Sequence, residues 1–177
     1  MKKLLAFFAL SLFVLSGCGY KSMTHYSKKA IGEKVYAKVE MLRSDPENTV
    51  LIKDAVNEAI VTKLRGKLVS EEEADTKMFV SVANVGLAAI QYDQNGYVIL
   101  YRTTVTLNTK VVRGTVIRSF STSGSYDFPI EPNTTVSDSK RFESIKNGAV
   151  KAIDMLISQI SILGVIDGAG ANSSKGN

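Results

Sequence analysis

The side chains most often used in catalysis are scarce in this chain. The sequence has one histidine, His25, and one cysteine, Cys18. A Ser-His-Asp triad would have to use His25, and the sequence contains neither a Gly-rich phosphate loop nor an HExxH helix. The acidic run Glu71-Glu72-Glu73 lacks the spacing of an EF-hand calcium loop. A catalytic pair of carboxylates brought together by folding remains an open alternative. The residue types nevertheless favour a binding protein over an enzyme. We expect neither a metal nor a dissociable cofactor.

The N-terminal residues have the pattern of an export signal. Lys2 and Lys3 precede an apolar run at residues 4–15, which is too short for a membrane-spanning helix of about 20 residues. The next residues, Leu15-Ser16-Gly17-Cys18, resemble the lipobox of bacterial lipoproteins. The resemblance implies that residues 1–17 are a signal peptide and that lipid is attached covalently to Cys18. An ordinary signal peptide that contains a cysteine is the alternative.

The residues around Cys18 indicate where the protein is anchored. A single cysteine cannot form an internal disulfide, which agrees with lipid attachment. Gly19 stands where an Asp would resemble an inner-membrane retention signal, so we expect the outer membrane. Residues 18–32 have no sustained period and contain three lysines. We expect a lipidated tether that either rests on anionic headgroups or is simply solvated.

The charge of the chain limits its partners only loosely. Removal of the signal peptide takes away Lys2 and Lys3, so the net charge falls from +5 to +3. This mild positive balance permits anionic partners without specifying one. The export signal argues against nucleic acid as a partner.

Residues 97–112 give the strongest strand signal. β-branched and aromatic residues dominate, and the side chains sort onto two faces with a period of two. The core face would carry Ile99, Tyr101, Thr103, Val105, Leu107, Thr109 and Val111. The polar face would carry Arg102, Thr104, Thr106, Asn108 and Lys110. Turns at Asn95-Gly96 and Arg113-Gly114 predict an antiparallel neighbour on each side.

Two segments have the periodicity of amphipathic helices. The first begins at Asp45 as N-cap and runs to about Arg65, with Gly66 as the C′ residue. The second begins at Asp138 as N-cap and ends at Gly164. Apolar residues recur every three or four positions in both segments, which predicts one buried face for each helix.

The remaining elements complete an α+β domain. Further strands are predicted at residues 33–41, 77–92 and 115–122, with a bulge or close backbone contact at Gly86 and an interruption at residues 123–125. The order β-α-β-β-β-α predicts two layers, a four-stranded mixed sheet with two helices packed on one face. We assign the domain to residues 33–164 and expect residues 165–177, rich in Gly, Ala, Asn and Ser, to be a disordered tail.

Several of these features together resemble a known family. Gly17-Cys18-Gly19-Tyr20, the β-α-β-β-β-α order, the Asn95-Gly96 hairpin and the closing amphipathic helix resemble the LptE family of lipopolysaccharide-assembly lipoproteins. The resemblance covers residues 18–163. It implies an outer-membrane lipoprotein that plugs a large β-barrel of the LptD type, assists its assembly and helps lipopolysaccharide reach the outer leaflet. The polar sheet face and the loops at residues 93–96 and 129–135 would contact the barrel.

The resemblance also implies where lipopolysaccharide could bind. Relatives carry a basic residue at the hairpin tip, which here consists of Gln94, Asn95 and Gly96. Gln94 takes the basic position, which argues against direct phosphate binding at the tip. A substitute basic set is Arg102, Lys110, Arg113 and Arg118. These residues could instead be solubilising charges or barrel-wall contacts. A free-standing lipoprotein that binds an envelope ligand or acts as a scaffold is the second functional hypothesis.

Overall fold

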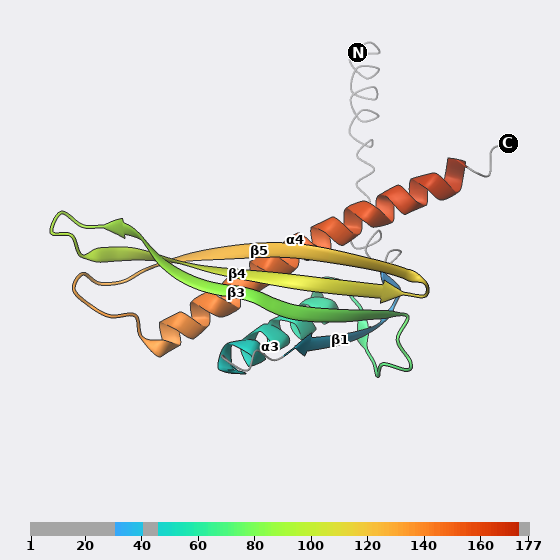
Figure 1. Cartoon of the computed structure of the whole chain (residues 1–177), viewed down its shortest axis with the longest axis horizontal. Coiled ribbons are helices and arrows are strands. Elements are labelled where there is room, and N and C mark those ends of the chain that lie inside the picture. Colours follow the sequence, from blue (N-terminus) through green and yellow to red (C-terminus); the bar gives the residue numbers. More distant parts are fainter. Residues whose placement is uncertain (1–30, 41–45, 174–177) are drawn as a thin grey trace, which may run out of the picture.

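The computed structural model of the chain describes residues 31–40 and 46–173 (Figure 1). The predicted signal peptide, Cys18, most of the tether and the N-cap Asp45 lie outside the described residues. The described elements are, in order, β1 (Lys34–Glu40), α3 (Pro46–Thr62), β2 (Lys67–Leu68), β3 (Thr76–Tyr92), β4 (Val98–Arg113), β5 (Val116–Pro129) and α4 (Asp138–Ser173). The predicted α+β class and the order of the longer elements are confirmed.

The strands in the described part of the chain form one five-stranded mixed sheet in the order β2-β1-β3-β4-β5. β1 is parallel to β2 and β3, whereas β3, β4 and β5 form an antiparallel meander. The prediction of four strands was wrong because β2 has only two residues, too few to leave an alternating pattern in the sequence. β4 is paired on both sides along most of its length, as its flanking turns predicted.

The end of α3 explains how β2 arises. The helix ends at Thr62, and Arg65 takes the left-handed conformation (φ 51°) that was expected at Gly66. The amide of Gly66 donates to the carbonyl oxygen of Ile60 at 2.9 Å and closes the helix. A Cβ on Gly66 would lie 3.3 Å from the side chain of Val35, so the glycine lets the chain return close beside β1.

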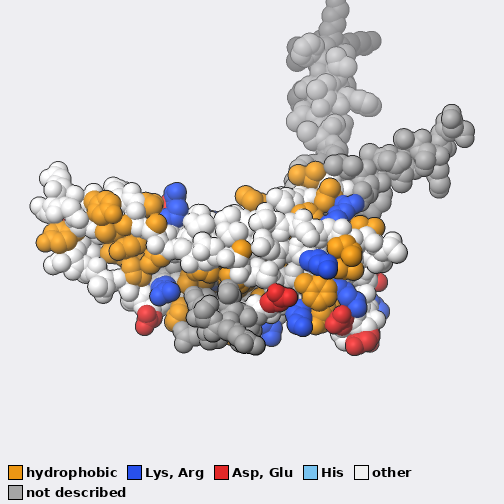
Figure 2. Space-filling model, viewed as in Figure 1, with side chains coloured by type: hydrophobic (Ala, Val, Ile, Leu, Met, Phe, Trp, Pro, Cys, Tyr) orange, Lys and Arg blue, Asp and Glu red, His pale blue; other side chains and the backbone are white. Residues whose placement is uncertain are grey.

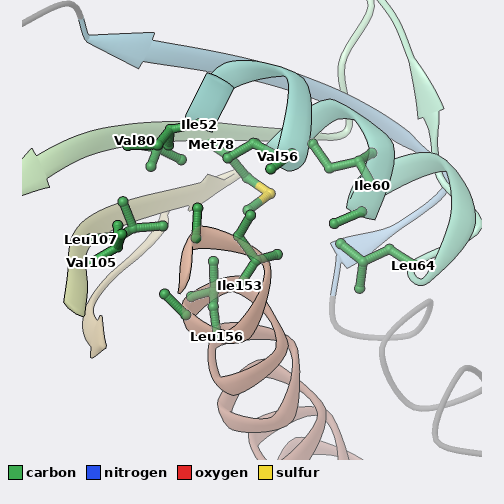
Figure 3. Close-up of a cluster of buried hydrophobic side chains, with 14 of the residues drawn as sticks. Ile52, Val56, Ile60, Leu64, Met78, Val80, Val105, Leu107, Ile153 and Leu156 are labelled. Carbon is green, nitrogen blue, oxygen red and sulfur yellow. The ribbon is translucent and has the colours of Figure 1, made fainter. Parts of the chain in front are cut away.

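Both described helices pack on the same face of the sheet, as predicted, and lie behind it in Figure 1. Figure 3 shows apolar side chains from both layers meeting between the helices and the sheet. These include Ile52, Val56 and Ile60 from α3, Met78 and Val80 from β3, Leu107 from β4, and Ile153 and Leu156 from α4. Burial of each large side chain stabilises the fold by about 1.5–3 kcal/mol. The predicted core positions Thr103 to Val111 of β4 are buried at every second residue.

β5 is longer than predicted. It runs without interruption through residues 123–125 and ends at Pro129. Gly124 lies against α4, where an added Cβ would be 2.2 Å from the carbonyl oxygen of Gly148. The glycine therefore marks a close contact between a strand and a helix, and the break that its Ser-Gly-Ser sequence indicated is absent from this strand.

α4 is also longer than predicted. It continues past Gly164 to Ser173, so the predicted helix end was wrong, and residues 165–173 are helical where the sequence indicated a tail. One glycine lowers helix stability by about 1 kcal/mol relative to alanine, which does not by itself end a helix.

Ile31, two residues before the predicted domain boundary, is part of the packed core. Its side chain is 2% exposed, and its carbonyl oxygen accepts a hydrogen bond from the hydroxyl of Thr76. The carboxylate of Asp75 accepts hydrogen bonds from the amides of Glu33 (3.2 Å) and Lys34 (3.0 Å). These contacts fix the direction in which the chain enters β1.

Candidate interaction surface

The sheet face opposite the helices is not covered by any described helix, and we call it the open face. On β4 and β5 it carries the cross-strand pairs Arg102–Asp127, Thr104–Ser125, Thr106–Ser123, Asn108–Ser121 and Lys110–Ser119. Hydroxyls meet in two of these pairs, at 3.0 Å for Thr104 and Ser125 and 3.1 Å for Thr106 and Ser123. Figure 2 shows the middle of this face as polar and mostly uncharged. The predicted polar face of β4 is thereby confirmed.

A bulge determines which β3 residues reach the open face. The β3–β4 register shifts between Val82 and Asn84, whereas Gly86 pairs regularly with Thr104. Neither alternative predicted at Gly86 is found there: the bulge lies earlier in β3, and an added Cβ at Gly86 would meet only the side chain of Asn84, at 3.4 Å. Because the extra residue reverses the alternation, the open face carries Phe79 before the bulge and Asn84 after it.

Arg102, the first member of the predicted basic set, is engaged by a carboxylate. Its Nε donates to Oδ1 of Asp127 and its Nη2 donates to Oδ2, each at 2.7 Å. This bidentate pair lowers the pKa of the Asp127 carboxyl from its usual value and raises the pKa of Arg102. The fork of the guanidinium is already occupied, so Arg102 is poorly placed to bind a phosphate in the same way.

The other three basic residues lie near the opposite end of the sheet and do not join Arg102. Lys110 is eight residues from Arg102 along β4, which corresponds to about 26 Å. Arg113 is the last residue of β4, before the turn at Gly114. Arg118 pairs with the buried Val111 and so belongs to the helix-facing side. The structure therefore divides the predicted set between two ends and two faces of the sheet.

The tip of the β3–β4 hairpin is a defined turn without a cation. Asp93 accepts hydrogen bonds through its carboxylate from the amides of Asn95 (2.9 Å) and Tyr97 (2.8 Å). Gly96 has a φ of 84°, which suits the predicted Asn-Gly turn. Gln94 is exposed at this tip, as the sequence placed it.

Hydrophobic side chains are exposed where this hairpin extends beyond the helices. The exposed fractions are 43% for Leu87, 39% for Ile90, 57% for Tyr92 and 44% for Tyr97. We call these four residues the hairpin cluster. Figure 2 shows hydrophobic side chains gathered at this end of the molecule. Sequence reasoning missed the cluster because the strand pattern does not reveal where the covering helices stop.

A shallow hollow of about 490 Å³ lies on the open face at the end remote from the hairpin tip. Its lining residues are Glu40, Phe79, Ser81, Asn108, Thr109, Lys110, Ser119, Phe120 and Ser121. Figure 2 shows hydrophobic surface surrounded by basic and acidic side chains at this end of the sheet. Among the predicted site residues only Lys110 belongs to the hollow. Its other members come from β4 itself and from β1, β3 and β5, and sequence alone did not bring them together.

No group of three or more His, Cys, Asp or Glu side chains among the described residues is arranged to hold a metal ion. No helix within the same residues is both long and apolar enough to cross a membrane.

Comparison with known proteins identifies the family. The family model LptE, described as lipopolysaccharide-assembly, matches residues 36–160. The chain belongs to the LptE family. Members of this family are non-enzymatic outer-membrane lipoproteins of lipopolysaccharide assembly, and this chain shares that general role. The resemblance noted in the sequence is confirmed.

Solved structures with low sequence identity are similar to this chain. A putative lipoprotein from Caulobacter crescentus has 8% identity and a TM-score of 0.53, covering 81% of this chain and 98% of its own. A Xanthomonas campestris protein has 14% identity and a TM-score of 0.51, covering 77% and 87%. Rare lipoprotein B from Shewanella oneidensis has 14% identity and a TM-score of 0.46, covering 80% and 99%. No curated protein matches the sequence.

Proposed function

We propose that this LptE-family lipoprotein, anchored through acylated Cys18, seats its domain inside a large outer-membrane β-barrel of the LptD type. There it acts as a plug and as an assembly partner during lipopolysaccharide insertion. The observation that carries the proposal is the hairpin cluster, an exposed hydrophobic surface at the end of a hairpin that extends beyond the helices. Large exposed apolar patches on soluble domains commonly mark interaction sites.

The energetics of the hairpin cluster favour association with a partner that covers it. Leu87, Ile90, Tyr92 and Tyr97 are each about half exposed. Complete burial of such side chains contributes about 1.5–3 kcal/mol each, so covering only part of their surface still stabilises a complex. The turn at Asp93 is held by hydrogen bonds to Asn95 and Tyr97, so ordering the tip costs little entropy on binding.

The open face suits contact with the interior of a barrel. The interiors of outer-membrane barrels are polar. The Thr104–Ser125 and Thr106–Ser123 pairs present hydroxyls that can both donate and accept hydrogen bonds. The middle of this face can therefore meet polar walls through hydrogen bonds.

Co-purification tests the proposal directly. The tagged full-length lipoprotein is extracted from its own outer membrane in mild detergent and purified, and accompanying proteins are identified and quantified by mass spectrometry. We expect a near-stoichiometric large β-barrel. A lipoprotein that is reproducibly free of any barrel, under conditions that preserve other barrel complexes, would contradict the plug and favour the free-standing binding module.

Matched variants test the part assigned to the hairpin cluster. Leu87→Ser with Tyr92→Ser should greatly reduce the recovered barrel, because both side chains are exposed in the free domain and buried in the proposed complex. The control is Val116→Ser with Ile117→Ser, which changes side chains of similar exposure, 50% and 59%, at the other end of the sheet. Equal barrel recovery from the two double variants would refute the role of the cluster. Thermal unfolding of each variant verifies that the fold is kept.

A further inference from the structure

The sequence contains two Asn-Gly pairs, and the fold places them in different settings. Asn95-Gly96 lies at the exposed tip of the β3–β4 hairpin, whereas Asn147-Gly148 lies inside α4. A glycine after an asparagine leaves the backbone nitrogen open to approach, because no Cβ shields it. Such a nitrogen can attack the amide carbon of the asparagine side chain, so each pair is a candidate for spontaneous chemical change.

The reaction is a deamidation and needs only water. The backbone nitrogen of Gly96 bonds to Cγ of Asn95, its proton passes through water to the side-chain nitrogen, and that nitrogen leaves as ammonia. Water then opens the resulting succinimide ring at either of its carbonyls. The products are aspartate, which keeps the original backbone, and isoaspartate, in which the backbone runs through the former side chain and is longer by a methylene group.

The pair inside α4 is withheld from this reaction by the helix. Gly148 is buried, and a Cβ there would lie 3.1 Å from the side chain of Val105 and 3.4 Å from the carbonyl oxygen of Gly124. Its amide nitrogen belongs to the hydrogen-bonded backbone of the helix, which fixes its position relative to Asn147. Ring closure at Asn147 would therefore require local unwinding of α4 and loss of its contact with β5.

The pair at the hairpin tip is open to water but restrained by Asp93. Asn95 and Gly96 are exposed, and a Cβ on Gly96 would meet no atom within 4 Å. The amide of Gly96 donates to the carbonyl oxygen of Asp93 at 3.1 Å. The Asp93 carboxylate accepts from the amides on either side of Gly96, those of Asn95 (2.9 Å) and Tyr97 (2.8 Å). The turn thus holds the attacking nitrogen, and the nearby negative charge opposes the loss of its proton.

We propose that Asn95 is a site of spontaneous deamidation and that Asp93 keeps the reaction slow in the folded chain. The tip must open before the nitrogen of Gly96 can reach Cγ of Asn95, and the hydrogen bonds to Asp93 stabilise the closed turn. Isoaspartate at position 95 would lengthen the backbone between Tyr92 and Tyr97 and shift these two members of the hairpin cluster relative to each other. The inference concerns the free lipoprotein and does not depend on a barrel partner.

Peptide mapping by mass spectrometry on the purified mature lipoprotein in detergent tests the proposal. The protein is incubated at mildly alkaline pH, either folded or unfolded in urea, and the peptides that contain Asn95 and Asn147 are followed over time. In urea both pairs should convert at similar rates. In the folded protein we expect conversion of Asn95 alone, at a lower rate than in urea. Conversion of Asn147 as fast as that of Asn95 in the folded protein would overturn the proposal.

Variants of Asp93 test the restraint. Asp93→Ala removes both carboxylate hydrogen bonds and should speed the conversion of Asn95 roughly tenfold, while the unfolding temperature stays close to that of wild type. Asp93→Asn keeps an acceptor oxygen without the charge and should give an intermediate rate. Asn95→Gln is the control and should abolish the product at the tip. An unchanged or lower rate in Asp93→Ala would contradict the restraint, as would equal rates for Asn95 in folded and unfolded protein.

Discussion

Gly124 of β5 and Gly148 of α4 meet backbone to backbone. A Cβ added to Gly124 would lie 2.2 Å from the carbonyl oxygen of Gly148 and 2.3 Å from the amide nitrogen of Ala152. No side chain separates the helix from the strand here, which sets how closely α4 approaches the sheet. The position of α4 in turn leaves the β3–β4 hairpin uncovered at one end.

Gly124→Ala should destabilise the domain by about 3 kcal/mol or prevent folding, because backbone atoms of α4 cannot move aside as a flexible side chain could. Urea unfolding followed by circular dichroism measures the loss. Gly86→Ala is the control, since a Cβ on this strand glycine would meet only the side chain of Asn84 at 3.4 Å. Its free energy of unfolding should stay within about 0.5 kcal/mol of wild type. Similar losses in the two variants would show that the helix contact is not the cause.

Two buried threonines of β4 should respond oppositely to valine. The hydroxyl of Thr109 has no hydrogen-bond partner among the described residues, and the cavity beside it is only about 10 Å³ and otherwise lined by apolar side chains. Thr109→Val should therefore raise the free energy of unfolding by about 1 kcal/mol. Denaturant titration measures the change.

The hydroxyl of Thr103, by contrast, lies 2.7 Å from that of Ser144 in a buried pair. Thr103→Val removes this hydrogen bond, while the Ser144 hydroxyl keeps its donation to the carbonyl oxygen of Arg141 at 2.8 Å. The substitution should therefore lower the free energy of unfolding by about 1 kcal/mol. Equal effects of the two valine substitutions, in size and sign, would contradict the hydrogen-bond assignment.

Stability should depend on pH through Asp75. Backbone hydrogen bonds from Lys34 and Glu33 lower the pKa of its carboxyl in the folded state. Because the pKa is lower in the folded state than in the unfolded state, where it is near 4, the carboxylate stabilises the fold at pH values above 4. This stabilisation is lost as the pH falls through the folded-state pKa. Asp75→Asn should thus be less stable than wild type at pH 7, and the difference should shrink below pH 4.

The control for Asp75 is Glu73→Gln, which removes an exposed carboxylate from the same connection. Thermal unfolding of the three proteins across pH 3–7 measures the dependence. If the unfolding temperatures of Asp75→Asn and wild type differ by the same amount over this whole pH range, the ionised carboxylate of Asp75 is not the source of the difference.

The parts of the fold that sequence could predict are those with long periodic patterns. The alternation from Thr103 to Val111 identified the buried face of β4, and the Asn95-Gly96 turn identified its hairpin. β2 is too short to have a pattern. Gly124 looked like a break because glycine signals both chain reversal and close packing, and only the position of α4 decides between them.

The candidate site was predicted less well because it depends on strand register. Arg102 was placed on the correct face, but its partner Asp127 lies 25 residues later and is brought opposite only by the pairing of β4 with β5. Glu40 and Ser81 were not singled out for the same reason, since they come together across a parallel pair joined by a helix. A bulge between Val82 and Asn84 also reverses the alternation of β3, so the sequence pattern before it does not predict which face the later residues take.

Site-specific photo-crosslinking in intact cells tests the central claim, that the domain sits in an outer-membrane barrel. A photoreactive amino acid replaces Tyr92, which is 57% exposed in the hairpin cluster, and crosslinked products are identified by mass spectrometry. We predict an adduct with one large outer-membrane β-barrel. Efficient crosslinking at Tyr92 to other proteins or to lipid, without any barrel adduct, would contradict the account.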